Sequence, residues 1–238
     1  MLAGLAGPPL PSPDRLVRPI VGIMARAPSS GGKSRLIRQL GTRDGTGLRT
    51  ALLRDTFAAV APIEARKAVL YTPLDGETEI GRMTPFETMF LVQRGATLGE
   101  RMRNGASDLL ARGFGRVVLV GADLPTLPTA YIVDGLERLT RQRESLVLGP
   151  AEDGGYYLIG LTRIYDGLFD GIPWGTADVL RRTQEAAAAL GLSVELLPTW
   201  YDVDHPSDLQ RVRQPPAEGY PVAHHTRAWL EANAIKVR

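Results

Sequence analysis

The sequence contains no cysteine and only three histidines, His205, His224 and His225. The lack of cysteine excludes disulfide bonds and thiolate-bound metals, and so few histidines argue against a histidine-rich zinc site. No apolar stretch approaches the roughly 20 residues that a membrane-spanning helix needs. The formal net charge is only +2, which is too small to favour a nucleic acid or a membrane surface as a partner.

The rest of the composition is that of an ordinary soluble protein. Of the 238 residues, 44% are hydrophobic and 23% are charged, enough for one large α/β domain or two small ones. Residues 1–18 contain several prolines and no basic residue ahead of the apolar ones. We therefore expect a disordered leader there rather than a signal peptide, and a cytoplasmic location.

Short apolar runs alternate along the chain with segments whose apolar residues have helical spacing. Strands are predicted at 19–25, 67–71, 89–92, 117–120, 146–148, 156–161 and 193–197. Helices are predicted at 48–61, 97–112, 131–139, 177–190, 206–213 and 226–234, and a surface loop at 72–85. This alternation predicts one α/β domain at 19–213, followed by a C-terminal tail at 214–238 with a short helix.

The stretch Val117–Pro125, VVLVGADLP, is predicted to contain a fully buried strand. Four apolar residues, three of them β-branched, run into a glycine, as in strands of mostly parallel sheets. Ligands bind outside the carboxyl ends of such strands, which is where Asp123 follows. A carboxylate there suits Mg²⁺ or Mn²⁺ held against phosphates. On position alone, capping of a helix that begins near Pro128 is an equally good role for Asp123.

The loop Ala27–Ser34, APSSGGKS, fits a relaxed Walker A pattern, in which glycine N–H groups and a lysine hold phosphates. The match is weak, because alanine replaces the first glycine and Pro28 lacks an N–H. A flexible basic loop is one alternative, and a phosphate-binding loop of another kind, with Lys33 and Arg35 as fixed cations, is the other. The residues assigned to the nucleotide phosphates are Ala25, Gly31, Gly32, Lys33, Ser34 and Arg35.

The segment Glu152–Tyr157, EDGGYY, is a candidate for recognition of hydroxyl groups. Its paired glycines allow a tight turn and close ligand approach, and one of its tyrosines should face the crevice. Taken alone, a β-turn with a solvated acidic tip explains the segment better. Trp174 could line the same pocket, although tryptophan is more often a core residue.

A third polar segment, Tyr201–Pro206, YDVDHP, places Asp202 and Asp204 two residues apart. In an extended chain both carboxylates then point to one side. Helix capping by Asp204 or His205 is the alternative. Together with Asp123, these carboxylates form a set of oxygen ligands that suits a hard cation. We therefore predict that Asp123, Asp202 and Asp204 bind Mg²⁺ or Mn²⁺, without choosing between the last two.

Several stretches in this order resemble the DUF2064 family, also called radical-SAM/selenodomain-associated transferase 1. They are ARAPSSGGKSRL, LGERM, GADLPTL, GPAEDGGYYLIGL, IPWGT and DVDHPSDL, and the resemblance spans residues 20–212. It implies the GT-A fold of the nucleotide-diphospho-sugar transferase superfamily, a Rossmann-like sheet with a parallel core and at least one antiparallel strand. The family's first loop more often reads P-x-P-G-x-x-K-T-R-L; here serine replaces the threonine and the second proline is missing.

The resemblance also implies roles for individual residues. Family members are commonly described as glycosyltransferases, including some for arsenosugars, and they are similar to 2-phospholactate and molybdenum-cofactor guanylyltransferases. In those enzymes a lysine–arginine loop holds the nucleotide phosphates and an aspartate after the central strand holds Mg²⁺. Here these features would be Lys33, Arg35 and Asp123. The implied partners are a nucleotide or nucleotide-sugar donor and a small-molecule acceptor, and no protein partner can be inferred.

Two reactions remain open. In glycosyl transfer, an acceptor hydroxyl attacks the anomeric carbon of an NDP-sugar, and Asp153 binds or activates that acceptor. In nucleotidyl transfer, an acceptor phosphate attacks an NTP, and Lys33 and Arg35 stabilise the leaving pyrophosphate. The family label favours the first reaction, which we prefer, and the loop favours the second. A non-catalytic nucleotide-binding module is a third hypothesis, against which the aspartates argue. The residues assigned to the acceptor are Glu152, Asp153, Gly154, Gly155, Tyr156 and Trp174.

Overall fold

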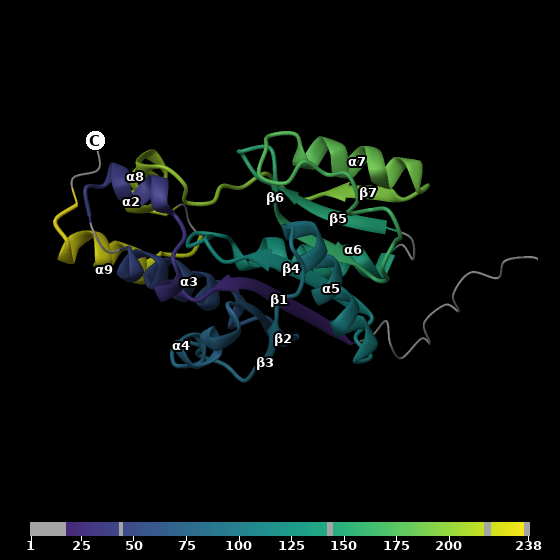
Figure 1. Ribbon diagram of the computed structural model, residues 1–238, viewed down its shortest axis with the longest axis horizontal. Helices are drawn as coiled ribbons and strands as arrows, with labels where there is room; N and C mark the ends of the chain where they lie inside the picture. The colour runs from purple at the N-terminus through teal and green to yellow at the C-terminus, as the bar shows by residue number, and fades with distance from the viewer. Residues whose placement is uncertain (1–17, 43–44, 142–144, 217–219, 236–238) are drawn as a thin grey trace, which may run out of the picture.

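The computed structural model describes residues 18–42, 45–141, 145–216 and 220–235, which form an α/β fold (Figure 1). Seven strands make one sheet in the order β3-β2-β1-β4-β6-β5-β7. The strands are β1 (Pro19–Arg26), β2 (Arg66–Thr72), β3 (Met89–Val92), β4 (Arg116–Gly121), β5 (Ser145–Pro150), β6 (Tyr156–Leu161) and β7 (Ser193–Leu196). The leader predicted at 1–18 lies, but for its last residue, outside the described residues.

The helices that flank the sheet are α2 (Ser34–Gln39), α3 (Thr46–Val60), α4 (Glu77–Gly81), α5 (Leu98–Ala111), α6 (Thr129–Arg141), α7 (Val179–Ala189), α8 (Pro206–Arg213) and α9 (His224–Ala232). Two 3₁₀ turns, η1 (Pro28–Ser30) and η2 (Leu74–Gly76), lie in the connections. No helix in the described ranges has the length and apolar character that crossing a bilayer requires.

The direction of β6 decides what lies at the carboxyl edge of the sheet. β1 pairs in parallel with β2 and β4, while β6 is antiparallel to both β4 and β5. The mixed sheet that the resemblance implied is therefore confirmed, with β6 as its antiparallel strand. Because β6 runs backwards, the turn that joins β5 to β6 lies at the same edge as the carboxyl ends of β1 and β4. Residues from both halves of the sheet can meet at this edge.

Two apolar clusters, one on each face of the sheet, make up most of the core. Leu53 and Phe57 of α3 pack with Ile132 of α6 on one face, while Leu109 of α5 and Ala187 of α7 pack on the other. Successive side chains of each strand point to opposite faces of the sheet, so the strands contribute to both clusters. Burial of this apolar surface holds the sheet rigid beneath its carboxyl edge.

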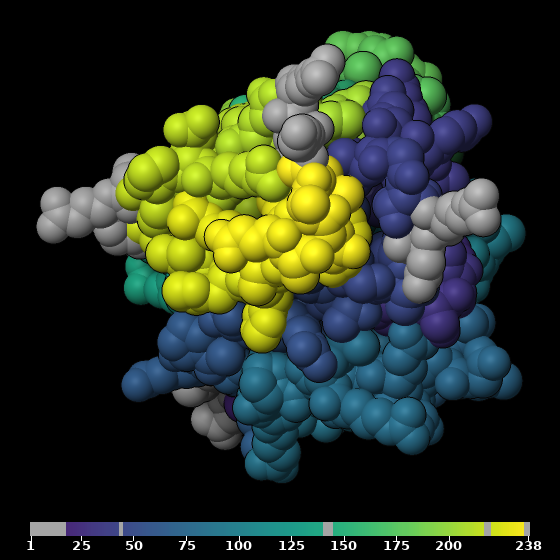
Figure 2. Space-filling view, turned by 90° about the vertical axis from the view of Figure 1, so that its left-hand side faces the viewer, coloured from purple at the N-terminus to yellow at the C-terminus, as the bar shows by residue number. Residues whose placement is uncertain are grey.

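A third apolar cluster joins α2, α3, α8 and α9. Its fully buried members include Leu48, Leu52 and Leu230. Asp55 of α3 accepts hydrogen bonds from the N–H groups of His225 and Thr226, which satisfies donors in the first turn of α9. Figure 2 shows the yellow C-terminal helix against the dark blue segment that contains α2 and α3. The predicted division at residue 213 stays a prediction.

The predicted strands and helices are confirmed, with ends that shift by no more than two residues. Two short helices were not predicted. α2 follows Lys33 directly, and its six residues are too few to show helical periodicity. The prediction of a loop throughout 72–85 was wrong for α4, a five-residue helix that one fully buried side chain, Ile80, anchors to the core.

Candidate functional site

The turn that carries Asp123 is fixed by a threonine from α3. The Thr56 hydroxyl donates to the carbonyl of Ala122 at 2.9 Å and accepts from the N–H of Leu124 at 3.1 Å. The carbonyl of Asp123 accepts from the N–H of Val203 at 3.1 Å. Asp123 therefore lies at the carboxyl end of β4, as predicted, and its turn is bonded to the acidic segment around Val203.

The acidic segment 200–204 is held at both ends. The Trp200 N–H donates to the carbonyl of Pro150, and the Trp200 carbonyl accepts from the N–H of Glu152, each at 2.9 Å. In the first turn of α8, Asp208 Oδ2 accepts from the N–H of Asp204 at 2.9 Å. These bonds place the β5–β6 turn beside residues that lie about 50 positions later in the sequence.

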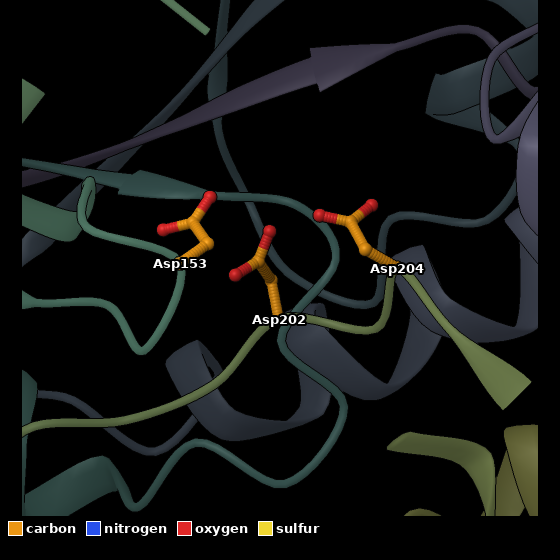
Figure 3. Close-up of side chains that lie close together, drawn as sticks. All are labelled: Asp153, Asp202 and Asp204. Atoms are coloured by element: carbon orange, nitrogen blue, oxygen red, sulfur yellow. The ribbon is translucent and has the colours of Figure 1, made fainter. Parts of the chain in front are cut away.

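Three carboxylates converge at this junction. Oxygen atoms of Asp153, Asp202 and Asp204 lie within 4.8 Å of one another, and Asp202 lies between the other two in Figure 3. Burial, together with a hydrogen bond to Asp204 and its charge, raises the pKa of Asp202 to about 7. Like charges are thus in excess here, and a cluster of hard oxygen donors fits Mg²⁺ or Mn²⁺.

Lys33 joins this cluster to Asp123. Its Nζ lies 2.5 Å from Asp204 Oδ1 and 3.0 Å from Asp123 Oδ2, and its side chain is only 10% exposed. Burial acts to lower the pKa of Lys33, but the charges of both aspartates outweigh it and raise the pKa above its usual range. Burial acts to raise the pKa of Asp204, yet Lys33 holds it below its usual value.

The backbone of Lys33 directs its side chain toward the aspartates. Lys33 has φ 54° and ψ 26°, a left-handed conformation that is uncommon for a residue other than glycine. The three predicted metal ligands therefore do not all belong to one carboxylate cluster. Asp202 and Asp204 belong to the three-carboxylate cluster, whereas Asp123 is linked to Asp204 through Lys33. The role of Asp123 as a metal ligand stays a prediction.

The loop before Lys33 is held from two sides. Arg49 of α3 donates to the carbonyls of Pro28 and Gly32, at 2.6 and 3.0 Å. Glu79 of α4 accepts from both the N–H and the hydroxyl of Ser29, at 2.9 and 2.5 Å. Gly32 has φ 110°, a value that side chains rarely adopt, so the glycine is required for this path. The flexible basic loop considered from the sequence is instead well anchored.

The predicted phosphate-binding residues do not all face one place. Gly31, Gly32 and Ser34 border a hollow of about 340 Å³, together with Arg38 and Arg49. The side chain of Arg35 is exposed, and that of Ala25 is buried in β1. Lys33 alone among the six forms ion pairs with the aspartates. A common phosphate site for the six stays a prediction.

The three-carboxylate cluster opens onto a cleft of about 220 Å³ at the carboxyl edge. The residues that line the cleft are of two kinds, and we call the part lined by carboxylates its polar end and the part lined by large apolar side chains its apolar end. The polar end is lined by Asp123, Asp153 and Asp202. The apolar end is lined by Leu98, Met102, Trp174 and Val179, and Gly155 and Tyr156 also line the cleft.

Two residues predicted to bind the acceptor do not line this cleft. Glu152 turns away and forms a bidentate ion pair with Arg211, at 2.6 and 2.9 Å. Gly154 has φ 90°, and a Cβ there would lie 2.2 Å from the carbonyl oxygen of Ala177, so its role is to permit a close backbone approach. Trp174 lines the cleft and makes an edge-to-face contact with Tyr156, with the ring centroids 6.3 Å apart.

Three residues near the cleft were not identified from the sequence. Leu98 and Met102 lie on the inner side of α5, where helical spacing predicts core residues, so the pattern could not separate cleft from core. Arg26 ends β1 and does not line the cleft; its side chain is exposed and forms no ion pair or hydrogen bond with any residue that the structure describes. Its position at the carboxyl end of a predicted strand, just before the glycine loop, could have identified it as a candidate site residue.

Comparisons with known proteins agree with this architecture. The profile of a family described as "Uncharacterized protein conserved in bacteria (DUF2064)" matches residues 53–176. A protein of Desulfovibrio desulfuricans G20, to which nucleotide-diphospho-sugar transferase activity has been attributed, is 29% identical with a TM-score of 0.79, over 91% of this chain and 96% of that one. No curated protein is similar enough in sequence to count as a match.

More distant structures share the fold alone. CMP:2-keto-3-deoxy-manno-octonic acid synthetase, in complex with CTP, is 12% identical with a TM-score of 0.54, over 82% of this chain and 97% of that one. The 4-diphosphocytidyl-2C-methyl-D-erythritol synthase is 17% identical, with the same TM-score and coverage. The fold described above is therefore shared with these two synthetases.

Proposed function

Because the chain belongs to the DUF2064 family, we propose that it is a metal-dependent glycosyltransferase, which moves a sugar from an NDP-sugar to a hydroxyl group of a small molecule. The fold and the relative from Desulfovibrio support a nucleotide-using transferase in general. The choice of glycosyl over nucleotidyl transfer rests on the charges that line the cleft.

The observation that carries this choice is the absence of cations on the acceptor side. No lysine, arginine or histidine is among the described residues that line the cleft, whereas Asp123, Asp153 and Asp202 are. No side chain that lines the cleft would offer an acceptor phosphate a positive charge, and these carboxylates would repel it unless the proposed cation were free to bind it. A hydroxyl acceptor, in contrast, needs a carboxylate nearby to take its proton.

The proposed cation site shares Asp202 and Asp204 with the three-carboxylate cluster. Asp202 and Asp204, with Asp123, would hold Mg²⁺ or Mn²⁺, which, when bound, would neutralise charge on the diphosphate leaving group. Lys33 already lies among these carboxylates with a full positive charge, and it would add to that stabilisation. Arg26 at the end of β1 and Arg35 in α2 are exposed cations at the two ends of the loop, suited to attract the donor phosphates.

Asp153 is the proposed general base. A hydrogen bond of 2.8 Å from the N–H of Gly155 to Asp153 Oδ1 orients its carboxylate at the polar end of the cleft. In the proposed reaction, the acceptor oxygen forms a bond to the anomeric carbon, the bond from that carbon to the phosphate oxygen breaks, and the proton moves to Asp153. The nucleoside diphosphate leaves with the electron pair of the broken bond.

Product analysis tests the proposal. The protein would be incubated with Mg²⁺ or Mn²⁺, a pool of acceptors, and either NDP-sugars or NTPs. We expect release of a nucleoside diphosphate from one NDP-sugar, and release that depends on the acceptor. Release of pyrophosphate from an NTP, without release from any NDP-sugar, would overturn glycosyl transfer and establish nucleotidyl transfer instead.

A further inference from the structure

We infer that the acceptor is an uncharged alcohol that carries a ring-sized apolar group beside its reacting hydroxyl. This inference rests on the proposed function and deepens it, since it names the chemical class of the acceptor. It is drawn from the apolar end of the cleft. Trp174 is the only residue there that was predicted to bind the acceptor.

The apolar end is built from two helices and the loop that carries Trp174. Leu98 is the first residue of α5 and is 48% exposed, and Met102 lies one turn later on the same side of the helix. Val179, the first residue of α7, lines the same cleft. A large apolar side chain exposed beside a polar cluster is costly in water, and covering it with an apolar ligand group recovers that cost.

This wall is already formed without a ligand. The indole of Trp174 packs against the backbone of Gly99, where a Cβ would lie 2.3 Å from the ring. The carbonyl of Gly154 accepts from the N–H of Leu180 at 2.9 Å, which ties the β5–β6 turn to α7. Burial raises the pKa of Tyr156 well above its usual range, so the phenol beside Trp174 stays neutral. A preformed wall costs little ordering entropy when a ligand binds.

The size and charge of the cleft limit what can bind. Its volume is about 220 Å³, and an apolar cavity of about 150 Å³ is enough for benzene. One ring and a hydroxyl-bearing carbon therefore fill most of it. Asp153 and Asp202 at the polar end disfavour a carboxylate or a phosphate on the acceptor, because no cationic side chain is among the described lining residues and the proposed metal would be engaged by the donor diphosphate.

Ligand titrations followed by NMR test the inference without any donor. Benzyl alcohol, glycerol and phenyl phosphate would be added separately, and the indole N–H signal of Trp174 followed. We expect saturable shifts with benzyl alcohol, and binding of glycerol and of phenyl phosphate at least about tenfold weaker. Leu98→Ser should weaken the binding of benzyl alcohol about threefold to tenfold.

Leu196→Ser is the matched control, because Leu196 is 44% exposed on β7 and does not line the cleft. Equal binding of benzyl alcohol to the Leu98→Ser and Leu196→Ser variants, tighter binding of glycerol or phenyl phosphate, or no binding of benzyl alcohol would each overturn the inference. Donor turnover is measured separately. Turnover with only polar acceptors would reject the acceptor class and keep glycosyl transfer. Binding of benzyl alcohol without release of nucleoside diphosphate from any NDP-sugar would keep the acceptor class and reject glycosyl transfer.

Discussion

The carboxyl edge of the sheet has two parts, a loop half and an acceptor half, whose charged side chains are arranged differently. The loop half, residues 26–35, pairs its buried cation Lys33 with two aspartates and fixes its backbone through Arg49 and Glu79. The acceptor half, residues 151–156 and 173–179 with Asp202, brings like charges together beside apolar side chains. The buried cation of the loop half therefore already has carboxylate partners, whereas the like charges of the acceptor half are relieved only when a cation or a proton binds.

This contrast follows from the sheet. The loop half follows β1, a parallel strand in the middle of the sheet, and the acceptor half precedes β6, the antiparallel strand. Because β6 is reversed, the β5–β6 turn lies at the same edge of the sheet as the loop that follows β1. The comparison teaches that a phosphate-binding side and an acceptor-binding side can be changed independently, which the following predictions test from the largest expected effect to the smallest.

Loss of the proposed base should have the largest effect. Asp153→Asn keeps the shape of the side chain and its bond to Gly155, but removes the charge that takes the proton. We expect kcat to fall by about 10²–10⁴-fold, with donor affinity unchanged, because the donor contacts the loop half. Steady-state kinetics and donor titrations measure the two quantities.

Asp170→Asn, at an exposed position away from the cleft lining, is the control for this substitution. An unchanged kcat in Asp153→Asn would remove Asp153 from the mechanism. A loss of donor affinity equal to the loss of kcat would mean that the two halves are not independent.

A change to the backbone of the acceptor half should come next. Gly154→Ala would force a Cβ to within 2.2 Å of the Ala177 carbonyl oxygen. Gly167→Ala is the matched control, because Gly167 also has a positive φ, 86°, but has no atom within 4 Å of the added Cβ. We expect Gly154→Ala to lower the free energy of unfolding by about 1–3 kcal/mol more than the control, as measured by denaturant titration. Equal losses would show that this close approach is unimportant.

The charge imbalance of the acceptor half predicts a pH dependence of metal binding. Asp202 has a pKa of about 7, so it is mostly protonated at pH 6 and mostly ionised at pH 8. A metal ion must displace that proton, so we expect Mn²⁺ affinity to be about tenfold weaker at pH 6 than at pH 8. Calorimetric titration at several pH values measures this. An affinity that does not change over this range would contradict the predicted metal site.

The raised pKa of Asp202 also affects stability in the absence of metal. An acid whose pKa is higher in the folded than in the unfolded protein makes the fold less stable as the pH rises between the two values, here from about 4 to about 7. Asp202→Asn should remove this part of the pH dependence. Comparison of thermal unfolding of the two proteins at pH 4.5 and pH 7.5 provides the measurement.

The smallest effect is expected at the exposed surface of the loop half. Arg35→Ala removes a solvated charge, so the affinity for the nucleoside diphosphate released from the donor should fall only about twofold to fivefold. The affinity for the corresponding nucleoside should not change, because the loop is predicted to contact phosphates. Arg54→Ala removes an equally exposed charge from α3 and serves as the control. A similar loss for nucleoside and nucleotide would place Arg35 elsewhere.

The sequence was sufficient to locate most strands and helices, but it was insufficient to show which of their side chains meet at the cleft. Periodicity and turn residues located the strand before Asp123 and the extended segment with Asp202 and Asp204. They could not show that Asp153 joins these carboxylates, because that depends on the pairing of Ala151 with Trp200.

Two further features were beyond sequence patterns for the same reason. Nothing near Glu152 in the sequence indicates that Arg211, 59 positions later, draws it away from the cleft. The apolar end of the cleft was hidden because a residue such as Met102 satisfies helical spacing whether it meets the core or a ligand. Local patterns locate segments, whereas contacts between distant segments decide which side chains meet.

The ion pair between Lys33 and Asp204 joins residues that are 171 positions apart. A ribosome that adds roughly 5–20 residues per second needs about 9–34 s to synthesise the intervening chain. Throughout that interval the nascent chain holds Lys33 without Asp204, although Asp123 emerges about halfway through it. The β1–β2 pair can form early in synthesis, but the cleft edge is completed only when the last acidic segment has left the ribosome. The lysine is thus among the first residues of the site to be made and among the last to gain its full set of partners.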